Sequence, residues 1–161
     1  IKEILLALKK LKETSIIFTM PGADLGNSLI ETEIKKFIKK NKNSFFYKSL
    51  GQISYFSILN QVDAVIGNSS SGILEMPYFK KATINLGSRQ LGRLQSSSIL
   101  NAEIKKNLIL NSLKKINTKN FKKKLKNNKN IYGKPGASNR IVKIIKKLKF
   151  ENLFQKKFYD I

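Results

Sequence analysis

Short runs of β-branched and aromatic residues alternate along most of this chain with segments of helical periodicity. The apolar runs predict strands at residues 15–19, 44–48, 64–67 and 82–86, and a further short strand at 98–100. Gly, Pro, Asn and Ser cluster between several of these runs, as is typical of loops. Strands that alternate with helices indicate an α/β fold, which we expect to be a Rossmann-like parallel sheet flanked by helices.

The helical segments show apolar residues three and four positions apart. The first contains Ile4, Leu5, Leu8 and Leu11, and at 161 residues the chain suits one domain. Ser138 is expected to cap a helix that continues to Leu148. Further helices are predicted at residues 29–38, 54–61, 103–116 and 120–125, and an amphipathic tail helix at 151–161.

The composition excludes several kinds of chemistry within this chain. It contains no Cys and no His, which excludes disulfides, Cys/His zinc sites and histidine acid/base catalysis. No carboxylate cluster suits Mg²⁺, so we predict no metal and no cofactor. No apolar run approaches the roughly 18 residues of a membrane span, and we expect a cytoplasmic protein without membrane contact.

The formal net charge of +22 arises almost entirely from lysine, with 29 Lys and only 3 Arg. Eight lysines and no acid lie between Lys114 and Lys129. The two interpretations are solvated helix faces in a compositionally biased chain and a surface for a polyanion or an acidic partner domain. A basic nucleic-acid-binding module is a third possibility. Because the sequence shows no aromatic RNA-binding signature and no arginine-rich reader helix, we expect no specific nucleic-acid partner.

A polar turn at residues 68–72, Asn-Ser-Ser-Ser-Gly, separates a predicted buried strand from a predicted helix. Unpaired N–H groups at such a helix start favour an anion, and a phosphate is the natural ligand. Glu75, about one turn further, is placed to accept hydrogen bonds from a ribose diol. The same residue types are favoured at helix caps. The second interpretation is that Ser70 or Ser71 caps the helix and that Glu75 complements its dipole.

Residues 65–93, VIGNSSSGILEMPYFKKATINLGSRQLGR, resemble the nucleotide-binding signature of hydrolysing UDP-N-acetylglucosamine 2-epimerases of the sialic and legionaminic acid pathways. Residues 18–26, 48–55 and 132–141 agree with that family in the same order. The resemblance implies the UDP-binding carboxyl-terminal domain, residues 1–161, of a two-domain glycosyltransferase-B-like protein. It also implies that the amino-terminal domain is missing, that the 151–161 helix packs toward it, and that the full-length protein is a homo-oligomer.

The resemblance assigns roles around the serine turn. Ser69 and Ser70 would bind the diphosphate of a UDP-sugar, Gly72 would stand at the helix amino terminus, and Glu75 would bind the ribose hydroxyls. Arg89, in the loop after the fourth strand, would lie near the phosphates, where its guanidinium offers a bidentate contact.

Four further residues carry weaker assignments. Leu50 would contact uracil through its backbone, and Tyr55 would place an aromatic ring against the base or pack in the core. Arg93 would either bind phosphate or stabilise its loop by an ion pair. Asp24 matches the family pattern and would belong to the substrate cleft or form an Asx turn, but Gly22 stands where many members have Asn.

The implied reaction is elimination of UDP from a UDP-N-acetylhexosamine, followed by hydration of the glycal with inversion at C2, to give an N-acetylmannosamine-type sugar. The acids and bases of this chemistry would lie largely on the other domain, so no catalytic residue is expected in this chain, which alone would be inactive. The alternatives are a non-hydrolysing UDP-GlcNAc 2-epimerase and a glycosyltransferase of the same overall fold.

Overall fold

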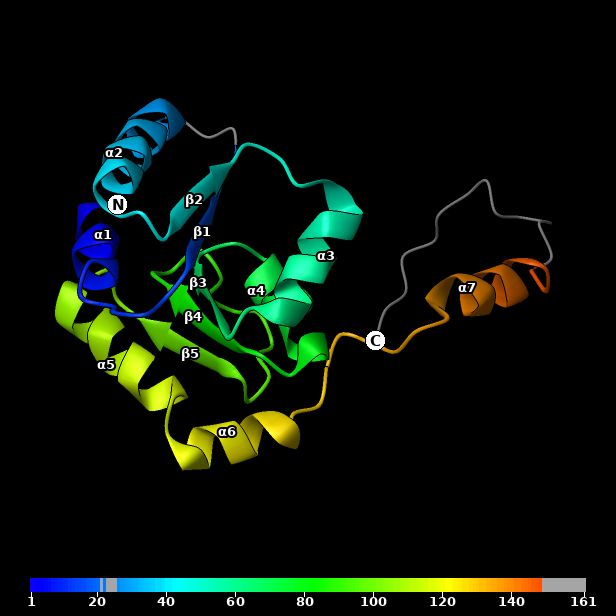
Figure 1. Ribbon diagram of the computed structural model, residues 1–161. Coiled ribbons are helices and arrows are strands. Elements are labelled where there is room, and N and C mark those ends of the chain that lie inside the picture. Colours follow the sequence, from blue (N-terminus) through cyan, green and yellow to red (C-terminus); the bar gives the residue numbers. More distant parts are fainter. Residues whose placement is uncertain (21, 23–25, 149–161) are drawn as a thin grey trace. The chain divides into compact units, whose positions relative to one another are not determined.

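Among the residues that the computed structural model describes, 1–20, 22 and 26–148, five short strands form the centre of the first of two units (Figure 1). The units are Ile1–Ile131 and Tyr132–Ile161. The strands are β1 (Ile16–Thr19), β2 (Ser44–Tyr47), β3 (Ala64–Gly67), β4 (Ala82–Leu86) and β5 (Ile99–Ala102).

All strand pairs run parallel, in one sheet of order β1-β2 and another of order β3-β4-β5. This confirms the predicted parallel α/β fold. The strand bounds match the predicted runs to within a residue or two, since each run is bounded by polar or turn-forming residues. Every residue of β4 is buried, as expected for the central strand of a parallel sheet.

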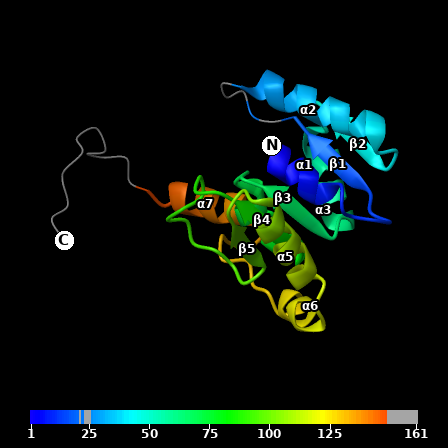
Figure 2. The same ribbon diagram turned by 90° about the vertical axis from the view of Figure 1, so that its left-hand side faces the viewer.

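Three helices cover one face of β4: α1 (Lys2–Leu8), α5 (Lys106–Ile116) and α6 (Lys119–Lys126). Figures 1 and 2 both show α1 beside α5. Because side chains alternate along a strand, every second residue of β4 faces these helices. The resulting core contains Ala7, Ala82, Ile84, Leu86, Ile109, Leu113, Ile116 and Phe121.

A second, smaller core brings residues of the two sheets together. Leu5 and Leu8 of α1 pack with Phe37 of α2 (Asn27–Lys40). Phe18 of β1 and Ile66 of β3 pack against the same cluster, and the Phe18 and Phe37 rings meet edge to face at 5.7 Å. The strands of both sheets therefore share apolar contacts, although they exchange no recorded ladder hydrogen bonds.

The other face of β4 carries shorter elements, α4 (Ser71–Leu74) and the 3₁₀ helix η1 (Met76–Phe79). The continuous helix that we predicted after the serine turn is thus a single α turn followed by a 3₁₀ turn. Pro77 accounts for the break, because it lacks the N–H that would continue the α-helical ladder.

Helix α3 (Gly51–Gln61) begins three residues earlier than the helix predicted at 54–61. Gly51 adopts a positive φ of 65° directly after Leu50, a conformation that glycine tolerates better than other residues. The helix start is therefore set by a glycine turn, which the apolar spacing used for the prediction does not register.

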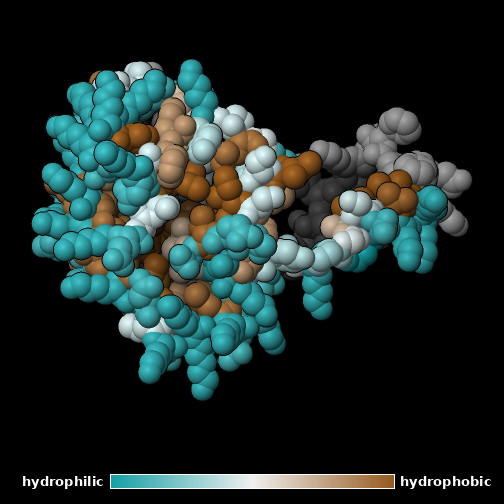
Figure 3. Space-filling model, in the orientation of Figure 1, coloured by the Kyte–Doolittle hydropathy of each residue, from teal (hydrophilic) through white to brown (hydrophobic). Residues whose placement is uncertain are grey.

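The lysine-rich stretch covers the end of α5, the amphipathic helix α6 and the residues after it, and α6 agrees with the helix predicted at 120–125. Thr118 caps α6 through its side chain, which accepts a hydrogen bond from the Phe121 N–H, and Phe121 is buried in the core. The α6 lysines are largely exposed, and hydrophilic side chains line the lower edge of Figure 3, where Figure 1 places α6. No helix in the described part of the chain has the length and apolar character of a membrane span.

In the second unit the described residues form helix α7 (Ala137–Ile145). The prediction that Ser138 caps this helix is wrong: Gly136 precedes the first turn with a φ of 87°, and Ser138 lies inside the helix. The Arg140 guanidinium donates to the carbonyls of Pro135 and Lys134 at 2.9 and 3.0 Å, which closes the preceding loop. The predicted 151–161 tail helix lies outside the described residues.

Candidate functional site

The serine turn follows β3 directly and leaves polar groups without partners. The Gly72 N–H donates to the Ser69 carbonyl at 3.3 Å, and the Ser71 N–H donates to the Ser69 hydroxyl at 3.4 Å. In the part of the chain that the structure describes, no acceptor is recorded for the N–H groups of Ser69 and Ser70. Two backbone N–H groups and the Ser70 hydroxyl are therefore close in the chain, and donors of this kind can bind an anion.

The capping interpretation of this turn is only partly supported. Ser70 occupies the N-cap position of α4, but its side chain makes no capping hydrogen bond. Since α4 has only four residues, its summed dipole is small, and the local N–H groups matter more than a macrodipole. Glu75 does more than complement a helix end, because it accepts a hydrogen bond from a side chain within the turn.

Ser71 connects Glu75 to helix α3. Its hydroxyl donates to Glu75 Oε2 at 2.5 Å and lies 2.6 Å from the hydroxyl of Tyr55. All three side chains are half-buried. Tyr55 and Glu75 are predicted site residues, whereas the sequence pattern suggests only a helix-capping role for Ser71. The four-residue spacing of Ser71 and Glu75 favours a contact between them. No local pattern predicts the contact of Ser71 with Tyr55, which is sixteen residues away.

Gly72 is buried against the sheet. A Cβ atom at this position would lie 2.7 Å from Thr83 Cγ2 of β4, and the Thr83 hydroxyl donates to the Gly72 carbonyl at 2.7 Å. The close approach of α4 to β4 therefore accounts for a glycine here without a ligand.

The arginine loop after β4 is tied to the serine turn by Gln90. This side chain is 4 % exposed, and its Nε2 donates to the Asn68 carbonyl at 2.8 Å. Arg89 and Arg93 flank Gln90 and are both exposed. The Gln90 hydrogen bond joins the segment that carries Arg89 to the serine turn, and the contact of Arg89 with phosphate stays a prediction. Sequence reasoning missed Gln90 itself.

Two buried amide oxygens near this loop have no recorded hydrogen-bond partner, Gln90 Oε1 and Asn85 Oδ1. Asn85 lies on β4 and donates from Nδ2 to Asn101 Oδ1 of β5 at 2.8 Å. Both side chains are buried, so they place polar groups in the interior at this end of the sheet.

Leu50 immediately precedes α3, one turn before Tyr55 on the same helix. The Gly51 N–H donates to the Ser49 hydroxyl at 3.3 Å, which fixes the bend there. Leu50 is thus held near the serine turn through Tyr55 and Ser71. Its contact with uracil, and the contact of the Tyr55 ring with the base, stay predictions. Asp24 lies outside the described residues.

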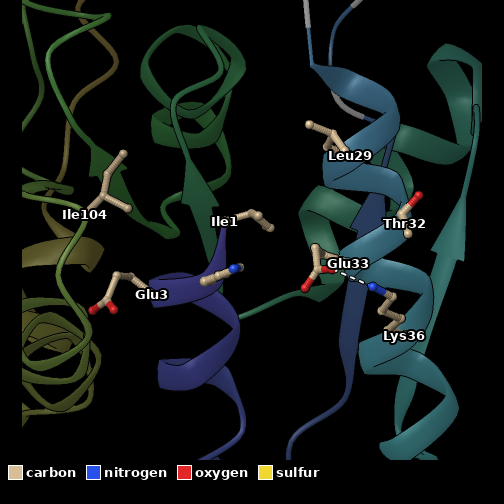
Figure 4. A pocket seen from close by; sticks show the side chains of 8 residues that line it. Ile1, Glu3, Leu29, Thr32, Glu33, Lys36 and Ile104 are labelled. Carbon is tan, nitrogen blue, oxygen red and sulfur yellow. Dashed lines mark hydrogen bonds and ion pairs between the residues drawn. The ribbon is translucent and has the colours of Figure 1, made fainter.

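An open groove of about 590 Å³ lies elsewhere on the first unit, between α1, α2 and the segment after β5 (Figure 4). In Figure 4, Leu29 and Glu33 of α2 lie on the side of the helix that faces Ile1, and an ion pair joins Glu33 to Lys36 at 2.9 Å. Of the predicted UDP-binding residues that the structure describes, none lines this groove.

The resolved electrostatic effects also lie outside the serine turn. Lys35, Lys36 and Lys105 lower the pKa of Glu31, Glu33 and Glu103, respectively, chiefly through side-chain hydrogen bonds. These carboxyls belong to surface ion pairs, which contribute little to stability. Among the described residues, no three His, Cys, Asp or Glu side chains gather in a way that would hold a metal ion.

Parallel strands covered by helices on both faces, with polar turns following β3 and β4, define a Rossmann-like α/β domain. The family model described as UDP-N-acetylglucosamine 2-epimerase matches residues 1–146. The chain therefore belongs to the UDP-N-acetylglucosamine 2-epimerase family.

Three curated relatives support this membership. A GDP/UDP-N,N'-diacetylbacillosamine 2-epimerase (hydrolyzing) of Campylobacter jejuni is 38% identical over 100% of this chain and 42% of its own length. Polysialic acid biosynthesis protein P7 of Escherichia coli is 35% identical over 100% of the chain and 41% of its length. A UDP-N,N'-diacetylbacillosamine 2-epimerase (hydrolyzing) of Legionella pneumophila is 31% identical over 81% of the chain and 33% of its length. The chain thus spans less than half the length of these relatives.

Proposed function

We propose that this chain is the UDP-binding domain of a hydrolysing UDP-sugar 2-epimerase. The observation that carries the proposal is the serine turn, where no acceptor is recorded among the described residues for the N–H groups of Ser69 and Ser70, and where Ser71 donates to the Glu75 carboxylate. Family membership supports UDP as the nucleotide. The word "hydrolyzing" in two of the relatives' names favours the hydrolysing reaction over the non-hydrolysing one.

In this proposal the serine turn holds the diphosphate. The N–H groups and hydroxyls of Ser69 and Ser70 donate to phosphate oxygens, and Arg89 adds a charged, two-pronged donor. Glu75 accepts hydrogen bonds from the ribose. Donors that meet the charge developing on the departing UDP lower the barrier to its elimination, so this domain would contribute to catalysis by binding the leaving group.

The remainder of the reaction belongs to the rest of the protein. The proposed substrate is UDP-N-acetylglucosamine or a UDP-diacetamido sugar, and the products are UDP and an N-acetylmannosamine-type sugar after addition of water. We propose that the acids and bases lie on an amino-terminal domain of a cytoplasmic homo-oligomer, in sialic or legionaminic acid biosynthesis. Product analysis of the full-length protein tests the reaction: free sugar plus UDP supports it, and an epimerised UDP-sugar contradicts it.

Replacement of Glu75 by Gln tests the ribose contact. A carboxylate forms stronger hydrogen bonds than an amide of the same shape, so Glu75→Gln should weaken UDP binding by about 1 kcal/mol. Isothermal titration calorimetry of the 161-residue chain with UDP measures this loss, and EDTA in the buffer tests the proposal that no metal is needed.

Glu31→Gln is the matched control, because Glu31 pairs with Lys35 on α2 and should leave UDP affinity unchanged. A folded parent chain that does not bind UDP contradicts the proposed function. Equal affinities for parent and Glu75→Gln would contradict the assignment of Glu75 alone.

Replacement of Gln90 by Ala tests the link between the arginine loop and the serine turn. Loss of the hydrogen bond to Asn68 should let Arg89 move away from the phosphates and weaken UDP binding by about 1 kcal/mol. Gln95→Ala, in the same loop, is the control, since Gln95 bonds to Asn101 instead. Similar losses in both variants, measured by the same titration, would mean that the loop acts only through its general fold.

A further inference from the structure

We infer that Tyr55 and Ser71 are positioning residues that hold the Glu75 carboxylate for a ribose diol, so that this hydrogen-bonded chain determines preference for ribose. The inference rests on the proposed function, because it assumes that Glu75 meets the ribose of UDP. Its structural basis is the sequence of contacts Tyr55 to Ser71 at 2.6 Å and Ser71 to Glu75 at 2.5 Å.

The chemistry of the three groups determines which atom donates in each of these hydrogen bonds. An ionised carboxylate only accepts hydrogen bonds, so Ser71 must donate its single hydroxyl proton to Glu75. Ser71 then has only lone pairs to offer, and the phenolic hydroxyl of Tyr55 must donate to it. Each donor polarises the next, which strengthens hydrogen bonds in half-buried surroundings.

The orientation of Glu75 depends on these neutral groups. The hydrogen bond recorded for its carboxylate comes from the neutral hydroxyl of Ser71. A cation there would compete with the ligand for the carboxylate, whereas the serine occupies only Oε2. No partner is recorded for Oε1 among the described residues, which leaves this oxygen to accept from a ligand.

The two donors, Tyr55 and Ser71, lie on different helices. The orientation of the Glu75 carboxylate therefore depends on a contact between α3 and α4. Tyr55 lies on α3, while Ser71 and Glu75 lie at the two ends of α4. Without Tyr55, the Ser71 hydroxyl could rotate away from Glu75 and bond to other acceptors. The Glu75 side chain would then sample more rotamers, and ribose binding would have to restrict them at an entropic cost.

The competing explanation is that the Tyr55 hydroxyl only fastens α3 to α4. A fastening of that kind would affect every ligand of the site equally. A positioning role instead affects only ligands that carry the diol. The two explanations can therefore be separated by comparing UDP with 2′,3′-dideoxy-UDP, which keeps the base and the diphosphate but lacks both hydroxyls.

The experiment titrates both nucleotides into the parent chain, Tyr55→Phe and Ser71→Ala by calorimetry. We expect the parent to prefer UDP, and each variant to reduce that preference roughly three- to tenfold while binding the dideoxy nucleotide like the parent. In the Glu75→Gln background, Tyr55→Phe should have little further effect, because residues that act through one group are not additive.

Tyr78→Phe is the matched control, since it removes an exposed tyrosine hydroxyl close to Glu75 in the sequence and should leave the preference unchanged. An unchanged preference in Tyr55→Phe and Ser71→Ala, or an equal loss for both nucleotides, overturns the inference while leaving the proposed function intact. Failure of the folded parent to bind UDP overturns the proposed function, and the inference with it.

Discussion

Replacement of Gly72 by Ala is expected to lower the free energy of unfolding by about 1–3 kcal/mol, the usual cost of overpacking a tight contact. The added Cβ would lie 2.7 Å from Thr83 Cγ2, on a strand whose every residue is buried. The strand has no room to retreat, because α1 and α5 pack on its opposite face. Urea denaturation monitored by circular dichroism measures the change.

A second substitution identifies the cause of this effect. Thr83→Ser removes the methyl group that the new Cβ would meet and keeps the hydroxyl that donates to the Gly72 carbonyl. The double variant should therefore regain much of the stability that Gly72→Ala loses. If the double variant instead loses as much stability as the two single variants together, the packing explanation is contradicted. A stable double variant with weak UDP binding would show that Gly72 also allows the ligand to approach the backbone.

Replacement of Arg89 by Ala is expected to weaken UDP binding by about 1.5–3 kcal/mol, the range for hydrogen bonds between charged groups. The reason is the loss of the guanidinium that we propose contacts the diphosphate, next to Gln90, whose side chain bonds to the serine turn. Arg89→Lys should recover only part of the loss, because an ammonium group supplies charge without the bidentate fork. Calorimetry with UDP measures all three proteins.

Arg93→Ala and a second ligand serve as controls for Arg89. Arg93 lies in the same exposed loop, so a general loss of positive charge would weaken both variants alike. Uridine lacks phosphates, and its binding should be insensitive to Arg89→Ala. A larger effect from Arg93, or an equal effect on uridine, would exclude the assignment of Arg89 to the diphosphate.

The positions of the strands were predictable from local pattern. Apolar runs such as residues 82–86 are favoured in the interior, where both faces of a parallel strand are buried. Polar residues or turns bound these runs on both sides. The lysines of α6 were also interpretable as a solvated face, since Phe121 keeps the apolar spacing of a buried helix side. The end of α4 was predicted less well, because Pro77 changes the helix type without changing the apolar pattern.

The candidate site was predictable only where its residues are neighbours in sequence. Ser69, Ser70 and Glu75 lie close together in the sequence, and their residue types favour either an anion site next to a carboxylate or a helix cap. Gln90 was missed because its partner, the Asn68 carbonyl, is 22 residues away and is a backbone group that no sequence pattern specifies. The role of Ser71 was missed because its second partner is on another helix.

Three features of this protein follow from local sequence. They are the order of strands and helices, the exclusion of thiol and histidine chemistry in this chain, and the serine turn that follows β3. These features depend on hydrophobic periodicity, composition and turn chemistry, which act between near neighbours. Three contacts could be found only in the folded protein. Gly72 packs on Thr83, Gln90 bonds to the serine turn, and the Tyr55 hydroxyl lies within hydrogen-bonding distance of Ser71. Those contacts join residues from separate elements, and they form only when the packing of helices on the sheet brings the elements within hydrogen-bonding or van der Waals distance.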